Sequence, residues 1–169
     1  MIILGVDPGT AVTGYGVLRT PSLTDKREER PEVVDYGCIR TSNTQEMPHR
    51  LRIIYQKMSE IIQKYHPEEI AIEEVFFNKN SKTALSVGQA RGVIILAASF
   101  KGGKVFSYTP LEVKQAITGY GRAKKRQVQH MIKKLLLLPQ IPFPDDASDA
   151  IAVALCHYHS RKLKSLATP

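Results

Sequence analysis

The chain has 169 residues, a length typical of one domain with a single hydrophobic core. A hydrophobic content of 43% and a charged content of 24% are ordinary for a soluble globular protein. The formal net charge of +8 is unusual, and it favours a polyanionic partner, more often nucleic acid than an anionic membrane. The apolar runs are too short to span a bilayer, and the N-terminal residues lack the pattern of a signal peptide.

The cysteine content indicates the compartment. Cys38 and Cys156 are the two cysteines, and neither has a metal-ligand neighbour at useful spacing except that Cys156 precedes His157. Two isolated cysteines fit a reducing cytosol better than a disulfide scaffold, so we interpret both as small core residues of a cytoplasmic protein.

The first predicted element is a buried strand that ends in an acid. Residues 2–6 form an apolar, β-branched run, Asp7 ends it, and Pro8 and Gly9 mark a turn. A carboxylate at the end of a buried strand is unfavourable unless it is paired. On residue type alone, Asp7 is also compatible with a simple role as a cap of the turn.

The next elements predict an antiparallel meander. Residues 12–18 form a second strand, in which Gly14 and Gly16 indicate a bulge or the close approach of another backbone. Residues 20–32 are polar and predict an exposed hairpin tip, and residues 33–40 form the third strand.

The remaining chain alternates between helical and strand periods. Apolar residues recur at helical spacing over residues 47–65, and a strand follows at 69–75, so this strand is predicted to lie parallel to the first. The further predictions are a helix at 81–100, a strand at 104–107, helices at 110–117, 124–138 and 145–162, and a disordered tail at 163–169. Without a linker or repeat, residues 1–169 form one α/β domain, a five-stranded mixed sheet of three meander strands and two parallel crossover strands flanked by helices.

Acidic side chains are predicted to meet at one edge of this sheet. Asp7 and Glu73 lie at the carboxyl ends of two parallel strands, and Asp146 and Asp149 share the first turn of the last helix. Taken one at a time, these acids have simpler explanations. Glu73 could be a strand acid paired with a lysine. The acids at the start of the last helix, Asp145, Asp146 and Asp149, could be stabilised by the helix dipole. Together, four acids in one cleft repel each other, and a divalent cation relieves this repulsion. Oxygen ligands alone favour Mg²⁺ or Mn²⁺.

A basic segment follows the sheet. Residues 113–144 contain no acid, and their lysines and arginines are Lys114, Arg122, Lys124, Lys125, Arg126, Lys133 and Lys134. A loop with this sign bias, leading into a helix N-terminus, favours contact with nucleic-acid phosphates over a merely solvated face. Phe76, in a polar loop after Glu73, is suited either to stack on bases or to pack into the core.

With these residues assembled, the chain resembles the RuvC family of Holliday junction resolvases, within the ribonuclease H-like fold. The resemblance extends from residue 2 to the last helix. It rests on a series of short motifs in order: residues 3–10 (ILGVDPGT), 13–17 (TGYGV), 37–41 (GCIRT), 71–76 (AIEEVF), 88–92 (GQARG), 127–131 (QVQHM) and 146–150 (DASDA).

The resemblance implies a site. The catalytic, metal-binding carboxylates would be Asp7, Glu73, Asp146 and Asp149, and the last motif selects Asp146 over Asp145. Two Mg²⁺ ions per site are implied, with Mn²⁺ as a substitute, in the two-metal arrangement of phosphodiester chemistry. DNA contacts are expected from Phe76, Lys114, Arg122, Lys124, Lys125 and Arg126.

The resemblance also implies an activity and partners. It implies a homodimer, formed through the helix at 81–100, that makes paired symmetric nicks in four-way DNA junctions during recombination and repair. It further implies a bacterial, nucleoid-associated protein that cooperates with the branch-migration proteins RuvA and RuvB. The tip at 20–32 departs from the family pattern, because it is longer than expected.

Three other classes remain as alternatives. The turn after Asp7 is similar to the phosphate-binding turn of actin-like and Hsp70-like ATPases, but 169 residues leave no room for a second lobe. A non-catalytic junction-binding protein would account for the basic loop but not for the four acids. A related ribonuclease H-like nuclease acting on RNA has the same fold, which cannot by itself define the substrate.

Overall fold

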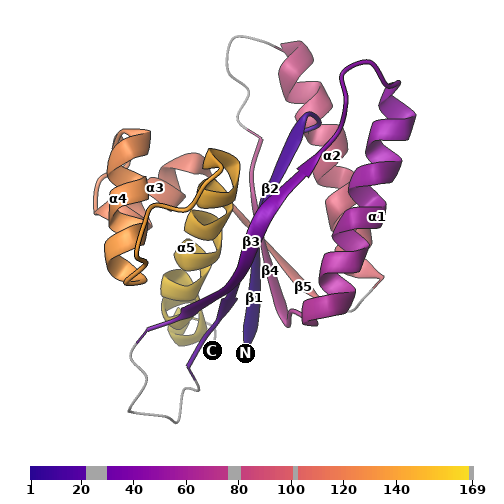
Figure 1. Ribbon diagram of the computed structural model, residues 1–169. Coiled ribbons are helices and arrows are strands. Elements are labelled where there is room, and N and C mark those ends of the chain that lie inside the picture. The colour runs from indigo at the N-terminus through magenta and orange to yellow at the C-terminus, as the bar shows by residue number, and fades with distance from the viewer. Residues whose placement is uncertain (22–29, 76–80, 101–102, 168–169) are drawn as a thin grey trace.

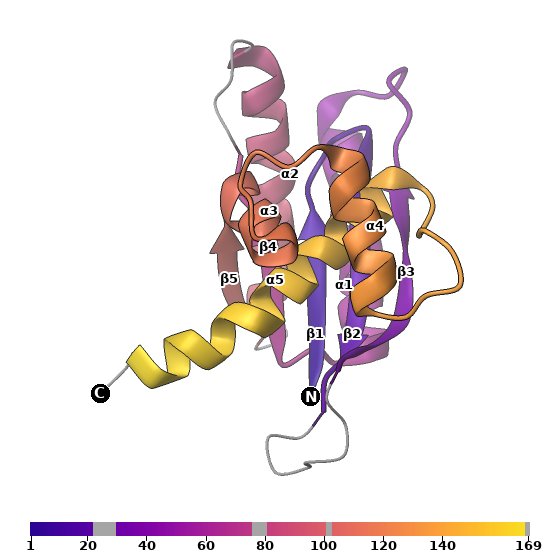
Figure 2. The ribbon, with the colours of Figure 1, turned by 90° about the vertical axis from the view of Figure 1, so that its left-hand side faces the viewer.

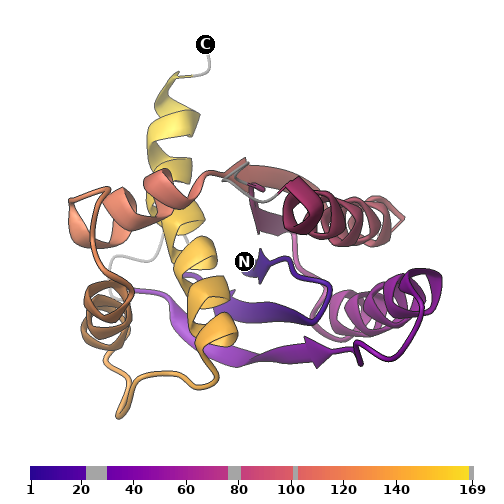
Figure 3. The same ribbon diagram turned by 90° about the horizontal axis from the view of Figure 1, so that it is seen from above.

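The protein is a sheet covered on both faces by helices (Figure 1). The computed structural model describes residues 1–21, 30–75, 81–100 and 103–167. Helices α1 (Met47–Tyr65) and α2 (Ser81–Ser99) cover one face, and α3 (Pro110–Thr118), α4 (Lys125–Leu135) and α5 (Asp145–Ala167) cover the other. Seen from above, α5 lies between the sheet and the pair α3 and α4 (Figure 3).

The order of the strands confirms the predicted mixed sheet. The strands are β1 (Ile2–Asp7), β2 (Val12–Arg19), β3 (Glu32–Arg40), β4 (Glu69–Glu73) and β5 (Lys104–Tyr108). They lie in the order β3-β2-β1-β4-β5, with β1, β2 and β3 antiparallel and with β4 parallel to both β1 and β5. The two parallel crossovers pass through α1 and α2, which accounts for the position of both helices on one face.

Glycines in β1 and β2 allow the backbone of α5 to approach the sheet. A Cβ atom on Gly14 would lie 2.0 Å from the carbonyl oxygen of Asp146, and one on Gly5 would lie 2.2 Å from that of Ala150. A Cβ on Gly16 would lie 2.7 Å from the side chain of Ile151. The sequence indicated either a bulge or the close approach of another backbone at Gly14 and Gly16. The structure confirms the close approach.

Each face of the sheet has its own apolar core. Ile54 and Met58 of α1 and Ile94 of α2 are fully buried against one face. Ile132 of α4 and Leu155 of α5 are equally buried on the other. Burial of each such side chain stabilises the fold by about 1.5–3 kcal/mol, so the sheet is held firmly between both helical layers.

A buried polar chain links α5 to the two parallel strands. His157 Nδ1 lies 2.7 Å from the hydroxyl of Tyr108, and His157 Nε2 lies 2.8 Å from Oε2 of Glu69. The Phe106 ring lies against the imidazole, with 4.4 Å between ring centroids. His157 is therefore part of the packing between α5, β4 and β5.

Two helices end more than one residue away from the predicted position. Helix α4 ends at Leu135 rather than at residue 138, because Leu137 adopts a left-handed φ of 49° and the Leu138 N–H bonds to the Lys133 carbonyl. Helix α5 continues to Ala167, past the predicted end at residue 162 and into the segment predicted to be a disordered tail. It contains no glycine or proline that would break it.

The predicted hairpin tip at 20–32 falls largely on residues 22–29, which lie outside the described residues. Among the helices that are described, none is both long and apolar enough to cross a membrane.

Candidate active site

Strand register places Asp7 and Glu73 at the same edge of the sheet. Val6 of β1 pairs with Ile72 of β4, so the next residue of each strand is an acid at the carboxyl end. The turn after β1 is held by Thr13, whose buried hydroxyl donates to the Gly9 carbonyl at 2.7 Å. Asp7 is engaged elsewhere, in a side-chain hydrogen bond with Glu73.

Helix α5 brings two more acids to this edge. Asp7 pairs with Gly14 across the β1–β2 ladder, and the first turn of α5 lies directly over Gly14. Asp146 and Asp149 both lie in that turn, and both are partly buried. The glycine in β2 is thus what allows the α5 acids to approach Asp7.

The pKa of Asp7 shows that Glu73, Asp146 and Asp149 lie near it. The pKa of Asp7 is raised from 3.8 to about 8, first by burial and then by the charges of Glu73, Asp149 and Asp146 in that order. A hydrogen bond with Glu73 acts in the same direction. Asp7 therefore holds a proton at neutral pH when no cation is bound, as expected for a carboxyl among like charges.

Glu73 and Asp149 are shifted in the same direction. Burial raises the pKa of Glu73, and the Asp149 charge adds to this, while the hydrogen bond to Asp7 and the charges of Lys114 and Lys125 oppose it. Burial also raises the pKa of Asp149, against the hydrogen bond and charge of Lys125. The site is thus a desolvated acidic cluster that two lysines neutralise in part.

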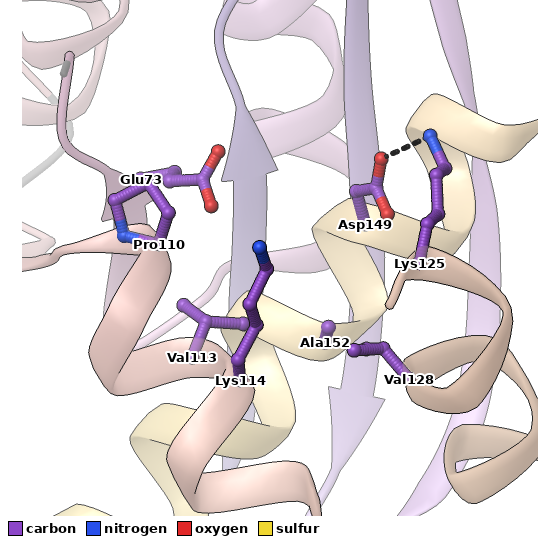
Figure 4. A pocket seen from close by; sticks show the side chains of 8 residues that line it. All are labelled: Glu73, Pro110, Val113, Lys114, Lys125, Val128, Asp149 and Ala152. Atoms are coloured by element: carbon purple, nitrogen blue, oxygen red, sulfur yellow. Dashed lines mark hydrogen bonds and ion pairs between the residues drawn. The ribbon is translucent and has the colours of Figure 1, made fainter. Parts of the chain in front are cut away.

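A pocket of about 190 Å³ opens beside these acids, between α3, α4 and α5 (Figure 4). It is lined by Glu73, Pro110, Val113, Lys114, Lys125, Val128, Asp149 and Ala152. The ammonium of Lys114 points between Glu73 and Asp149, and Lys125 reaches Asp149 from the opposite wall. An anionic group that enters this pocket would meet both lysines.

Lys125 makes the direct contacts among these groups. Its Nζ lies 2.7 Å from Oδ2 of Asp149 and 3.5 Å from Oδ2 of Asp145. Gln129, one turn further along α4, donates to Oδ1 of Asp145 at 3.0 Å. The DASDA motif selects Asp146 over Asp145, and no sequence pattern indicates a role for Gln129. The i, i+4 spacing of Asp145 and Asp149 was the available indication of the shared lysine.

The chemistry of these donors fits a divalent cation. They are carboxylate oxygens, the ligands that Mg²⁺ and Mn²⁺ prefer, and their buried negative charge is only partly compensated. Within the part of the chain that the structure describes, no three Asp, Glu, His or Cys groups already form a closed cage for one ion. Glu73, Asp146 and Asp149 act on Asp7 through their charges, and Asp149 accepts a hydrogen bond from Lys125.

The other predicted DNA contacts have different positions. Arg122, Lys124 and Arg126 are exposed on the loop between α3 and α4 and on the first turn of α4 (Figure 2). They do not line the pocket. Phe76 lies outside the described residues.

A family model and the similar curated proteins carry the same description. A family model described as crossover junction endodeoxyribonuclease RuvC matches residues 3–157. A Pelotomaculum thermopropionicum protein of that name is 53% identical over 168 residues, with 97% of this chain and 99% of the relative covered. One from Alkaliphilus metalliredigens is 52% identical over 166 residues, with 98% of each chain covered.

Two solved structures extend the match to three dimensions. The Thermus thermophilus RuvC structure has a TM-score of 0.87 and 31% identity, with 97% of each chain covered. T. thermophilus RuvC in complex with Holliday junction substrate has a TM-score of 0.84 and 29% identity, with 96% of each covered. The fold is therefore the ribonuclease H-like fold expected from the sequence, and the chain belongs to the RuvC family of crossover junction endodeoxyribonucleases.

Proposed function

We propose that this protein is a metal-dependent endonuclease that resolves four-way DNA junctions by hydrolysing phosphodiester bonds. One observation carries the proposal: Asp7, Glu73, Asp146 and Asp149 are close enough that the three other charges raise the pKa of Asp7. Such repulsion is unfavourable for a fold, and it is useful where a divalent cation must be held. A relative of 29% identity has been solved in complex with Holliday junction substrate.

The four carboxylates are the proposed metal ligands. The chemistry supplied by two bound Mg²⁺ ions, for which Mn²⁺ can substitute, is activation of the attacking water and stabilisation of the leaving oxygen. Asp7 and Glu73 would share one end of the sheet as ligands, and the first turn of α5 would contribute Asp146 and Asp149. For Asp7 to act as a ligand, it must first release the proton that its environment favours.

The two lysines of the pocket would position the scissile strand. Lys114 and Lys125 approach the acids from α3 and α4, so a phosphate placed over the carboxylates would lie within reach of both ammonium groups. Arg122, Lys124 and Arg126 extend the positive surface outside the pocket and suit neighbouring phosphates. Phe76, three residues after Glu73 in the sequence, is proposed to contact bases at the junction.

Helix α2 supports a homodimer. Leu85 and Leu96 are 67% and 49% exposed, although both are large apolar side chains. Gly88 and Gly92 lie on the same helical stripe, and a Cβ atom on either would meet nothing within 4 Å. Small residues between exposed leucines allow a second α2 to approach closely, and a two-fold dimer would match paired cuts in a four-way junction.

We propose that the protein acts in the bacterial cytoplasm, near the nucleoid, together with the branch-migration proteins RuvA and RuvB. The bacterial origin of the relatives supports this cellular setting. A pull-down of labelled RuvA and RuvB by the chain, with and without a four-way junction, tests this partnership.

The decisive experiment uses a synthetic four-way junction and a linear duplex of the same sequence. Each is incubated with the protein in Mg²⁺ or in EDTA, and the products are separated on a denaturing gel. Paired nicks in the junction alone, only with Mg²⁺, are expected from the wild-type chain, and Asp7→Asn should bind the junction but not cut it.

The alternatives have different outcomes in the same assay. Metal-independent binding without cleavage would indicate a junction-binding protein. Cleavage of an RNA strand in preference to the DNA junction would indicate a nuclease of the same fold with another substrate.

A further inference from the structure

Asp145 is an acid beside the proposed metal ligands that has no assigned role. Its side chain is 60% exposed, whereas that of Asp149 is 30% exposed, so Asp145 lies on the outer side of the same helical turn. Lys125 Nζ lies between them, at 2.7 Å from Asp149 and 3.5 Å from Asp145. One ammonium group is therefore shared between a proposed metal ligand and a neighbouring acid.

The carboxylate of Asp145 is held in place from the other side. Gln129 donates to its Oδ1 at 3.0 Å, while its Oδ2 faces Lys125. Gln129 is only 7% exposed and lies four residues after Lys125, so both side chains project from the same face of α4. A buried amide that fixes one oxygen leaves the other oriented toward the lysine.

We propose that Asp145 is a positioning residue for Lys125. When a divalent cation binds Asp149, the Lys125 ammonium group moves to the Asp145 carboxylate. This inference rests on the proposed function, because it needs a cation at the carboxylate cluster.

The reason is competition for Asp149. A lysine bonded to a metal ligand opposes binding of the metal, since both neutralise the same charge. With Asp145 beside it, Lys125 can release Asp149 without losing an ionic partner, and it stays at the mouth of the pocket. Without the Asp145 charge, the ammonium would pair with Asp149 alone and compete more strongly.

The test measures Mn²⁺ binding without DNA, by the electron paramagnetic resonance signal of free Mn²⁺. Asp145→Asn keeps the oxygen that Gln129 binds and removes the charge that Lys125 faces. We expect its dissociation constant for Mn²⁺ to rise about threefold.

Lys125→Ala alone should lower the dissociation constant for Mn²⁺, because the ammonium group that competes for Asp149 is gone. Adding Asp145→Asn to Lys125→Ala should then have no further effect. Cleavage of a junction should show the same threefold shift in the Mg²⁺ concentration for half-maximal rate.

Controls separate positioning from general electrostatics. Glu60→Gln, on α1 across the sheet, removes the same charge and should leave Mn²⁺ binding unchanged. Titrations at about 0.3 M salt, where the Debye length is roughly 6 Å, suppress distant charge effects. Two results would overturn the inference. One is an equal loss of Mn²⁺ affinity when Asp145→Asn is introduced into the wild-type chain and into Lys125→Ala. The other is no loss of Mn²⁺ affinity when Asp145→Asn is introduced into the wild-type chain. Failure of the unaltered chain to bind Mn²⁺ would instead overturn the proposed metal-dependent function together with the inference.

Discussion

Asp7 makes the stability of the chain depend on pH. Its pKa in the folded protein is about 8, above the ordinary value of 3.8, so the folded state retains a proton that the unfolded chain releases. A group of this kind lowers stability as pH rises from about 4 to 8, because the unfolded state then gains more from ionisation. The acidic cluster therefore destabilises the metal-free fold above neutral pH.

Asp7→Asn should remove this effect. In EDTA at pH 8.5, we expect the variant to be more stable than the wild type by at least about 1–2 kcal/mol, since one pKa unit corresponds to about 1.4 kcal/mol. At pH 3 the difference should nearly vanish, because Asp7 is then protonated in both the folded and the unfolded wild type. Denaturant unfolding at both pH values measures this, and a variant that is less stable at both would contradict it.

The same proton should compete with the metal. At limiting Mg²⁺, we expect the cleavage rate to rise with pH up to about 8, because Asp7 must lose its proton to become a ligand. Raising the Mg²⁺ concentration should move the midpoint of this profile to lower pH. Single-turnover rates across pH 6–9 at two Mg²⁺ concentrations provide the measurement, and a midpoint that ignores Mg²⁺ would separate the profile from the metal site.

At the residue scale, the sequence predicted where Asp7 and Glu73 lie better than it predicted which side chains contact the acids. Asp7 and Glu73 could be placed from strand ends, because parallel strands share a carboxyl edge. The contact of Lys125 with Asp145 and Asp149 could not be placed, because it depends on how α4 docks on α5. The burial of His157 between Tyr108 and Glu69 could not be predicted either, because it depends on how α5 packs on the sheet.

Among the elements, α5 depends most on the glycines beneath it. In Gly14→Ala, a Cβ placed 2.0 Å from the Asp146 carbonyl forces the first turn of α5 away from the sheet. We expect a loss of stability of about 2 kcal/mol or more, by analogy with overpacked cores, and a fall in cleavage of at least tenfold. Thermal unfolding and single-turnover cleavage measure the two effects, and a variant with native stability and rate would show that the contact is not needed.

The extent of each element was predictable where a sequence signal existed. The parallel pairing of β4 with β1 followed from the crossover helix between the meander and β4, and close approach was one of the two explanations that glycine in a strand offered for Gly14 and Gly16. The end of α4 at Leu135 carried no such signal, because a leucine rather than a glycine takes the left-handed conformation there. Helix α5 exceeded its predicted length because residues 163–167 (LKSLA) contain no glycine or proline that would end a helix.

For the whole molecule, the exposed stripe on α2 formed by Leu85, Gly88, Gly92 and Leu96 predicts that paired cleavage requires a dimer. We expect Leu96→Glu to shift the protein from dimer to monomer, because a charge in a close helix contact is unfavourable. Junction cleavage should then change from paired to single nicks and fall at least tenfold. Sedimentation velocity and a cruciform plasmid assay measure the two changes, and Leu111→Glu, at an exposed leucine of α3, is the matched control for dimerisation. A monomeric wild type, or a dimeric Leu96→Glu, would remove α2 from the interface.

The β1–β2 glycines have a further consequence for synthesis of the chain. Asp7 is synthesised long before Asp149, and their approach waits until α5 settles on Gly5, Gly14 and Gly16. A nascent chain on the ribosome therefore lacks an assembled acidic cluster until α5 has been translated. The capacity to cut DNA would then appear all at once, when α5 packs on the sheet, and not in a partly folded chain.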